Sequence, residues 1–96
     1  MEKINKCHSL EEVRTNIDNI DHKIVDLITR RGEYVRQAAT FKKSTDDVKA
    51  PKRVEQVIQK VREIADEAGG NPKIVEKIYR AMIAAFINAE LSEYNQ

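Results

Sequence analysis

The sequence predicts an all-α fold with three helices per chain, a long first helix and two shorter ones. Apolar residues recur at steps of three and four, as on one face of a helix, rather than in the alternation typical of a strand. Both prolines, Pro51 and Pro72, stand where a helix would begin. The 96 residues fit one small domain. We expect its core over about 9–94 and a flexible arm over 1–8.

The first helix is predicted from Ser9 to Lys42, and the rest of the chain is organised around it. Ser9 and Glu12 have the spacing of a capping box, in which each side chain accepts a hydrogen bond from a backbone N–H of the first turn. An apolar stripe then follows the helical period. Its members are Val13, Ile17, Ile20, Ile24, Leu27, Val35 and Ala38.

Two cations continue this stripe. Arg31 stands four residues after Leu27, and Lys42 stands four after Ala38. On a straight helix they would lie roughly 16 Å apart along the axis and about 20° apart around it, so both could hold one small dianion. Arg14 would lie roughly 25 Å from Arg31 and about 100° around the helix, so it could join such a site only from another chain.

The segment Lys43–Ala50 is polar and predicts a loop. A second helix is expected from Pro51 to Ala68, ended by two glycines, and a third from Pro72 to about Tyr94, capped by Asn71. The second helix has the stripe Val54, Val57, Ile58, Val61, Ile64 and Ala65. The apolar residues of the third include Ile74, Val75, Ile78, Met82, Ile83, Phe86, Ile87 and Leu91.

The unequal helix lengths predict an intertwined homodimer. The first helix would be about 50 Å long, against roughly 27 and 35 Å for the others. Two shorter helices of the same chain cannot cover its whole stripe, and a second copy of the chain could.

Composition excludes several classes of function. The net charge of +1 gives no basic field for nucleic acid, and no apolar run approaches a membrane span. Met1–Leu10 is too polar for a signal peptide, so we expect a cytoplasmic protein. Cys7 is the one cysteine, which excludes an internal disulfide. Cys7 and His8 alone are a poor metal site, and no cofactor is expected.

Each candidate site residue also has an ordinary structural explanation. Lys42 could simply complement the dipole of a helix C-terminus, and Arg14 could form an ion pair. Glu90 lies on or beside the third stripe, where it could pair with a cation, or where burial could favour the protonated form that donates a hydrogen bond. Arg31 cannot easily reach water and has to be neutralised or extend along the surface. Together these residues predict a site for a small anion.

Four segments resemble the all-helical chorismate mutase family. They read LEEVRTNIDNIDHKIVDLITRR, YVRQAATFK, VKAPKRV and AMIAAFINAE. The resemblance extends from about Leu10 to Leu91, and the three cations recur at the family's spacing. The FK and AP-x-RV motifs look most like the isochorismate pyruvate lyase branch, which serves salicylate and siderophore biosynthesis. The resemblance implies a three-helix chain and a dimer with two equivalent helical sites.

The resemblance also implies a role for each candidate residue. Arg14 matches the arginine that the partner chain donates to a substrate carboxylate, and Arg31 matches the arginine that binds a carboxylate in its own subunit. Lys42 matches the lysine at the ether oxygen and a carboxylate. Glu90 matches a position, usually Gln in bacterial members, that donates to the same oxygen. Arg53 matches a residue near the substrate at the start of the second helix.

Two departures from the family pattern bear on the reaction. Ala50 and Val54 stand where typical bacterial mutases carry acidic residues for the ring hydroxyl, and the lyase branch also lacks these. Glu90 must be protonated to stabilise a developing oxyanion. The resemblance therefore implies a chorismate mutase forming prephenate for aromatic amino acids, or alternatively a lyase forming salicylate and pyruvate. A non-catalytic dimerisation module and a helix-turn-helix DNA binder fit less well.

Overall fold

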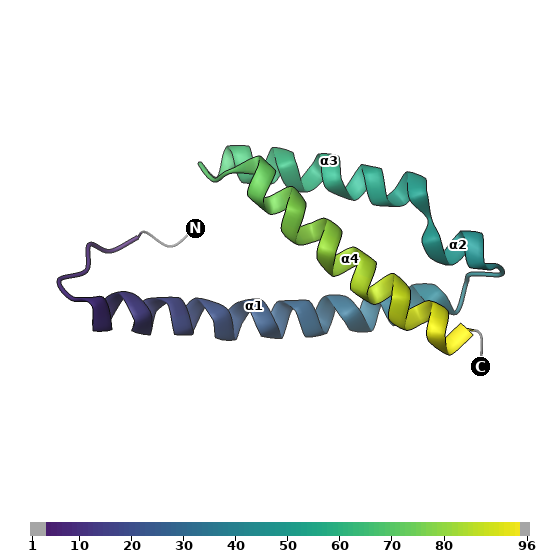
Figure 1. The fold of residues 1–96 in the computed structure, drawn as a ribbon, viewed down its shortest axis with the longest axis horizontal. Coiled ribbons are helices and arrows are strands. Elements are labelled where there is room, and N and C mark those ends of the chain that lie inside the picture. Colours follow the sequence, from purple (N-terminus) through teal and green to yellow (C-terminus); the bar gives the residue numbers. More distant parts are fainter. Residues whose placement is uncertain (1–3, 95–96) are drawn as a thin grey trace. The chain divides into compact units, whose positions relative to one another are not determined.

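A computed structural model describes residues 4–94, and all of its regular elements are helices (Figure 1). They are α1 (Leu10–Ala39), α2 (Thr45–Lys49), α3 (Pro51–Glu67) and α4 (Pro72–Tyr94). The predicted all-α class with a long first helix is confirmed, and the short helix α2 was not among the predicted helices. The contacts divide the chain into two compact units, one up to Tyr34 and one from Val35 onward. Residues 1–3 of the expected arm lie outside the described part.

The first unit contains an N-terminal arm and most of α1. The Ser9 hydroxyl accepts a hydrogen bond from the Glu12 backbone N–H at 3.1 Å, as the capping box predicts. The Glu12 carboxylate accepts from the backbone N–H of His8 at 2.8 Å, one residue before the expected donor. None of the residues of α1 is buried, and its apolar stripe is exposed from Val13 to Leu27.

The first helix ends earlier than predicted, and this changes the placement of Lys42. After Ala39, the backbone N–H groups of Thr40, Phe41 and Lys42 donate to carbonyls three residues back, at 3.1–3.2 Å. Such tight turns use carbonyls that a helix terminus leaves unpaired. Lys42 therefore lies beyond the helix, and the 16 Å spacing from Arg31 calculated for one straight helix does not apply.

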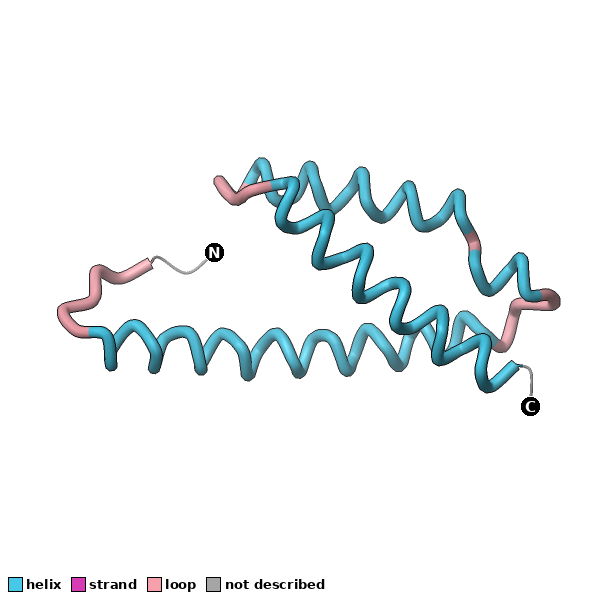
Figure 2. The backbone as a smooth tube through the Cα atoms, in the orientation of Figure 1, coloured by secondary structure: helices cyan, strands magenta, loops and turns pink. Residues whose placement is uncertain are grey.

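The predicted loop Lys43–Ala50 contains the short helix α2, so that expectation was wrong in part. A short helix begins within this polar segment, because Ser44 caps α2 by accepting from the Asp47 backbone N–H at 3.2 Å. Ala50 ends α2 in the left-handed conformation, with φ 39°, and Pro51 then begins α3 (Figure 2). Two helices thus meet at one residue.

The helices α3 and α4 lie side by side and form most of the second unit (Figure 1). Gly69 has φ 76°, and the Gly70 N–H donates to the Ala65 carbonyl at 2.8 Å, so α3 ends in a Schellman motif. Asn71 caps α4 through its side-chain oxygen, as predicted. The buried core consists of Val48, Ile58, Val61 and Ala65.

Three apolar residues of the stripes predicted for α3 and α4 remain exposed in this chain. They are Ile64 of α3, and Ile74 and Ile78 of α4. The stripes on α3 and α4 are therefore wider than the surface that these two helices cover on each other. The apolar stripe of α1 is also exposed.

An ion-pair network joins α3 to α4. The Arg80 guanidinium donates two hydrogen bonds to the Glu55 carboxylate, at 3.0 and 3.1 Å, and a third to Glu76 at 2.8 Å. Arg62 of α3 also donates to Glu76. The hydrogen bonds from Arg80, and then from Arg62, hold the pKa of Glu76 below its usual value. The same carboxylates, with Glu55 first, raise the pKa of Arg80.

Candidate active site

The structure brings two of the predicted site residues together within the second unit. The Lys42 Nζ donates to the Glu90 Oε2 at 3.1 Å, across 48 positions of sequence. The turn after α1 supplies Lys42, and the last part of α4 supplies Glu90. Their side chains are only 22% and 11% exposed. A cation and a carboxylate are therefore held in contact away from bulk water.

This pair fits both explanations of Glu90 that the sequence allows. A stripe-edge glutamate was expected to pair with a cation, and Lys42 is that cation. The same two groups are also those that the family resemblance assigns to one oxygen of a substrate. In such a site the ammonium always donates, whereas the carboxyl donates only when it carries a proton.

The other predicted site residues belong to α1 and α3. Arg53 is the third residue of α3 and is exposed. Arg14 lies near the start of α1 and is exposed, whereas Arg31 is partly buried further along the same helix. The two arginines of α1 belong to the first unit, and the pair of Lys42 and Glu90 to the second. The roles of Arg14, Arg31 and Arg53 stay predictions.

Sequence reasoning missed the local structure that follows Lys42. The Lys43 backbone N–H donates to the Asp47 carboxylate at 3.0 Å, while Ser44 accepts from the Asp47 N–H. The signal was present as S-x-x-D, the same kind of spacing that marked the start of α1. It was overlooked because the surrounding residues are turn formers.

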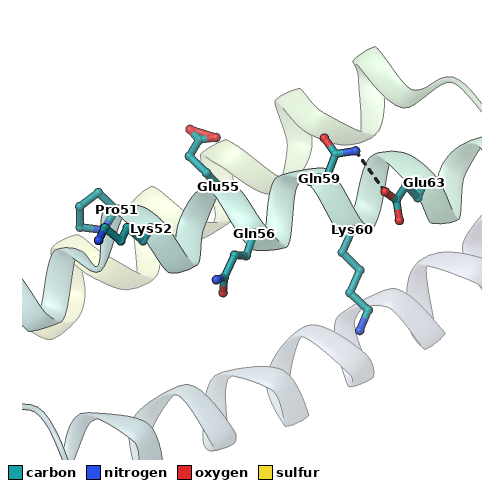
Figure 3. Close-up of a pocket in the computed structure, with 7 residues that line it drawn as sticks. All are labelled: Pro51, Lys52, Glu55, Gln56, Gln59, Lys60 and Glu63. Carbon is teal, nitrogen blue, oxygen red and sulfur yellow. Dashed lines mark hydrogen bonds between the residues drawn. The ribbon is translucent and has the colours of Figure 1, made fainter.

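The other surface features of the chain give less support for a functional site. Figure 3 shows a shallow, exposed face of α3 where Gln59 donates to Glu63 at 3.1 Å. Its lining consists of Pro51, Lys52, Glu55, Gln56, Gln59, Lys60 and Glu63. Over residues 4–94, no group of three or more His, Cys, Asp or Glu is arranged to hold a metal. None of the described helices is long and apolar enough to cross a membrane.

Comparison with known proteins identifies the family. The sequence profile of the chorismate mutase type II family matches residues 13–91, most of the chain. The chain belongs to the chorismate mutase type II family. All five predicted site residues fall inside the matched range. The predicted resemblance is therefore confirmed at the level of the family.

Two relatives carry different activities in their names. An isochorismate pyruvate lyase of Pseudomonas aeruginosa is 32% identical over 90 residues, which are 94% of this chain and 89% of the relative. A chorismate mutase of Methanocaldococcus jannaschii is 29% identical over 75 residues, which are 77% of this chain and 76% of the relative. The family is thus established, and both reactions occur among its members.

Proposed function

We propose that this protein is a chorismate mutase, which rearranges chorismate to prephenate within one active site. The observation that carries the proposal is the shielded contact between Lys42 and Glu90 in a chain of this family. The rearrangement breaks a C–O bond and forms a C–C bond inside one molecule. It requires no nucleophile, metal or cofactor.

Positioning supplies the first part of catalysis. Arg31 of one subunit and Arg14 of the partner subunit bind the two carboxylates of the substrate, with Arg53 nearby. Holding both ends selects the compact conformer in which the reacting carbons approach each other. Guanidinium groups suit this task because they bind carboxylates with two parallel hydrogen bonds.

Stabilisation of the breaking bond supplies the second part. Negative charge grows on the ether oxygen as the C–O bond breaks, and Lys42 donates to that oxygen. Glu90 donates to the same oxygen in its protonated form. In the free protein the two groups instead bond each other at 3.1 Å. Substrate therefore has to displace this contact.

A second candidate activity is isochorismate pyruvate lyase. This elimination breaks the same kind of C–O bond with an internal hydrogen transfer, and it releases pyruvate and salicylate. Ala50 and Val54 favour it, because neither side chain can accept a hydrogen bond from the ring hydroxyl that typical mutases hold. The named activity of the Pseudomonas relative also favours it.

We further propose that the active form is a cytoplasmic homodimer. The apolar stripe of α1 remains exposed, as do Ile74 and Ile78 of α4. Exposed apolar surface of this extent is typical of an interface. A second copy would cover it and would contribute Arg14 to the site.

A paired assay tests the function. Purified protein is given chorismate and isochorismate separately across pH 5 to 8, and prephenate, pyruvate and salicylate are measured. Dominant prephenate formation supports the mutase, and dominant pyruvate release supports the lyase. Absence of both, together with no binding of a bicyclic transition-state analogue, would refute both candidates and leave a non-catalytic helical module.

A further inference from the structure

The position of Lys42 depends on the segment that follows it. Lys42 belongs to no helix, and its own N–H donates back to Ala39 at 3.1 Å. On its other side, the next N–H in the chain, that of Lys43, donates to the Asp47 carboxylate at 3.0 Å. Asp47 therefore joins the backbone beside Lys42 to the first turn of α2.

The Ser44 side chain completes this connection. The Ser44 hydroxyl accepts from the Asp47 N–H at 3.2 Å, and the backbone carbonyl of Ser44 accepts from the Val48 N–H at 3.2 Å. Ser44 and Asp47 thus form a reciprocal cap, which we call the α2 cap. The Asp47 carboxylate accepts from the N–H of the residue before Ser44. In the same way, the Glu12 carboxylate accepts from the residue before Ser9 at the start of α1.

The helix α2 is in turn fastened to α4, the element that carries Glu90. Val48 is 2% exposed, the least exposed core residue, and α2 packs against α4. At the other end of α2, the Ala50 N–H donates to the Asp46 carbonyl at 2.9 Å before α3 begins. The α2 cap consequently connects the backbone at Lys42 to the helix that presents its partner.

We infer that Asp47, supported by Ser44, is a positioning residue for Lys42 in the proposed reaction. This inference rests on the proposed function. Asp47 accepts a hydrogen bond from the backbone N–H next to Lys42, and it acts by holding the backbone from which Lys42 extends. Without the bond from the Lys43 N–H to Asp47, the backbone beside Lys42 loses this connection to the first turn of α2, and the ammonium is held less firmly.

The first test compares Asp47→Ala with Asp46→Ala and Asp47→Asn. Asp46 lies in the same first turn of α2 as Asp47, and Asp46→Ala removes the same charge. Asp46→Ala is a matched control, because it is Asp47 that forms the α2 cap. We expect Asp47→Ala to lower kcat about 10-fold with a smaller change in KM, because misplacement of a catalytic group acts mainly on the chemical step. Asp47→Asn keeps an acceptor oxygen and should restore most of kcat. Equal losses in the two alanine variants would overturn the inference.

A second test separates this inference from the proposed function. The coupling between Lys42 and Glu90 is measured from unfolding of Lys42→Met, Glu90→Gln and the double variant, with Asp47 intact and again with Asp47→Ala. Positioning predicts a weaker coupling once Asp47 is gone. An unchanged coupling would overturn the inference even in an active enzyme. A weakened coupling in a protein that has neither activity would support the positioning of Lys42 by Asp47 and would refute the proposed function.

Discussion

At the residue scale, the role proposed for Glu90 is to donate a hydrogen bond to the ether oxygen of the substrate. An ionised carboxylate would repel the charge growing on the ether oxygen, so only the protonated form assists. Glu90→Gln places an amide at this position, which donates a hydrogen bond without carrying an extra proton, so we expect it to keep or raise kcat. Steady-state rates of both proteins provide the measurement.

The alanine variant at the same position controls for this interpretation. Removing a donor at an oxyanion commonly costs about 10² to 10³ in kcat. Glu90→Ala should therefore be much slower than Glu90→Gln. An unaltered rate for Glu90→Ala would remove Glu90 from the catalytic set.

Ala50 also acts at the residue scale, through backbone strain. Its φ of 39° and ψ of 59° lie in the left-handed region, which costs an alanine about 1–2 kcal/mol. Ala50→Gly relieves this cost but adds about 0.4–1 kcal/mol of unfolded-chain entropy. Relief is the larger effect, so we expect a net stabilisation of up to about 1.5 kcal/mol. Thermal or denaturant unfolding at fixed protein concentration measures it.

Ala68→Gly is the matched control for that change. Ala68 has φ −80°, where alanine is unstrained, so the same substitution should destabilise the protein by about 0.4–1 kcal/mol. The two variants should thus shift stability in opposite directions. Equal destabilisation by both would show that the conformation of Ala50 carries no strain.

At the scale of elements, the Glu76 network makes the packing of α3 on α4 sensitive to acid. Arg80 first, and then Arg62, hold the pKa of Glu76 below its ordinary value by donating hydrogen bonds to the carboxylate. A lowered folded-state pKa adds stability that is fully present above the ordinary value near 4.5 and is lost as pH falls through the lowered value. Glu76→Gln should therefore lower Tm at pH 7, with a smaller difference at pH 3.

Glu63→Gln provides the comparison for this effect. Glu63 accepts a hydrogen bond from Gln59 of its own helix, and this bond does not join α3 to α4. Its neutralisation should change Tm little at either pH. A difference between wild type and Glu76→Gln that is the same at pH 7 and pH 3 would contradict the linkage.

The elements were predictable from sequence to the extent that their determinants are local. The three long helices were predicted nearly to their ends from the apolar period, the Ser9 cap, the two glycines and Asn71. The end of α1 and the existence of α2 were missed, because polar residues within 40–50 form both turns and caps. Lys42 therefore contacts Glu90 from a turn, and not from the helix on which its spacing was calculated.

The covered faces depend on long-range packing and could not be read from periodicity. Ile64, Ile74 and Ile78 carry the helical period as clearly as Ile58 and Val61, yet only the latter two are buried. Periodicity identifies an apolar face but not the surface that covers it. The same holds for Arg14 and Arg31, whose spacing along α1 gives no information on the chain that completes their site.

At the scale of the whole molecule, the exposed stripe of α1 and the separation of Arg14 from Arg31 lead to one decisive prediction. If Arg14 acts in the partner's site, then Arg14→Ala and Arg31→Ala homodimers each lack one arginine in both sites, and both should be nearly inactive. A heterodimer of the two variants has one site with both arginines and one with neither. Purified heterodimers, isolated through two different affinity tags, should therefore recover about half of the wild-type activity per dimer.

The alternative arrangement gives a different result in the same experiment. If both arginines act within one chain, each site of the heterodimer lacks one of them, and mixing restores nothing. A heterodimer of Arg14→Ala with the double variant Arg14→Ala/Arg31→Ala is the control, because it has no complete site under either arrangement. Recovery in the first heterodimer but not in the control would establish both the dimer and the exchange of Arg14. Complete inactivity of a well-folded mixed dimer would contradict the exchange of Arg14.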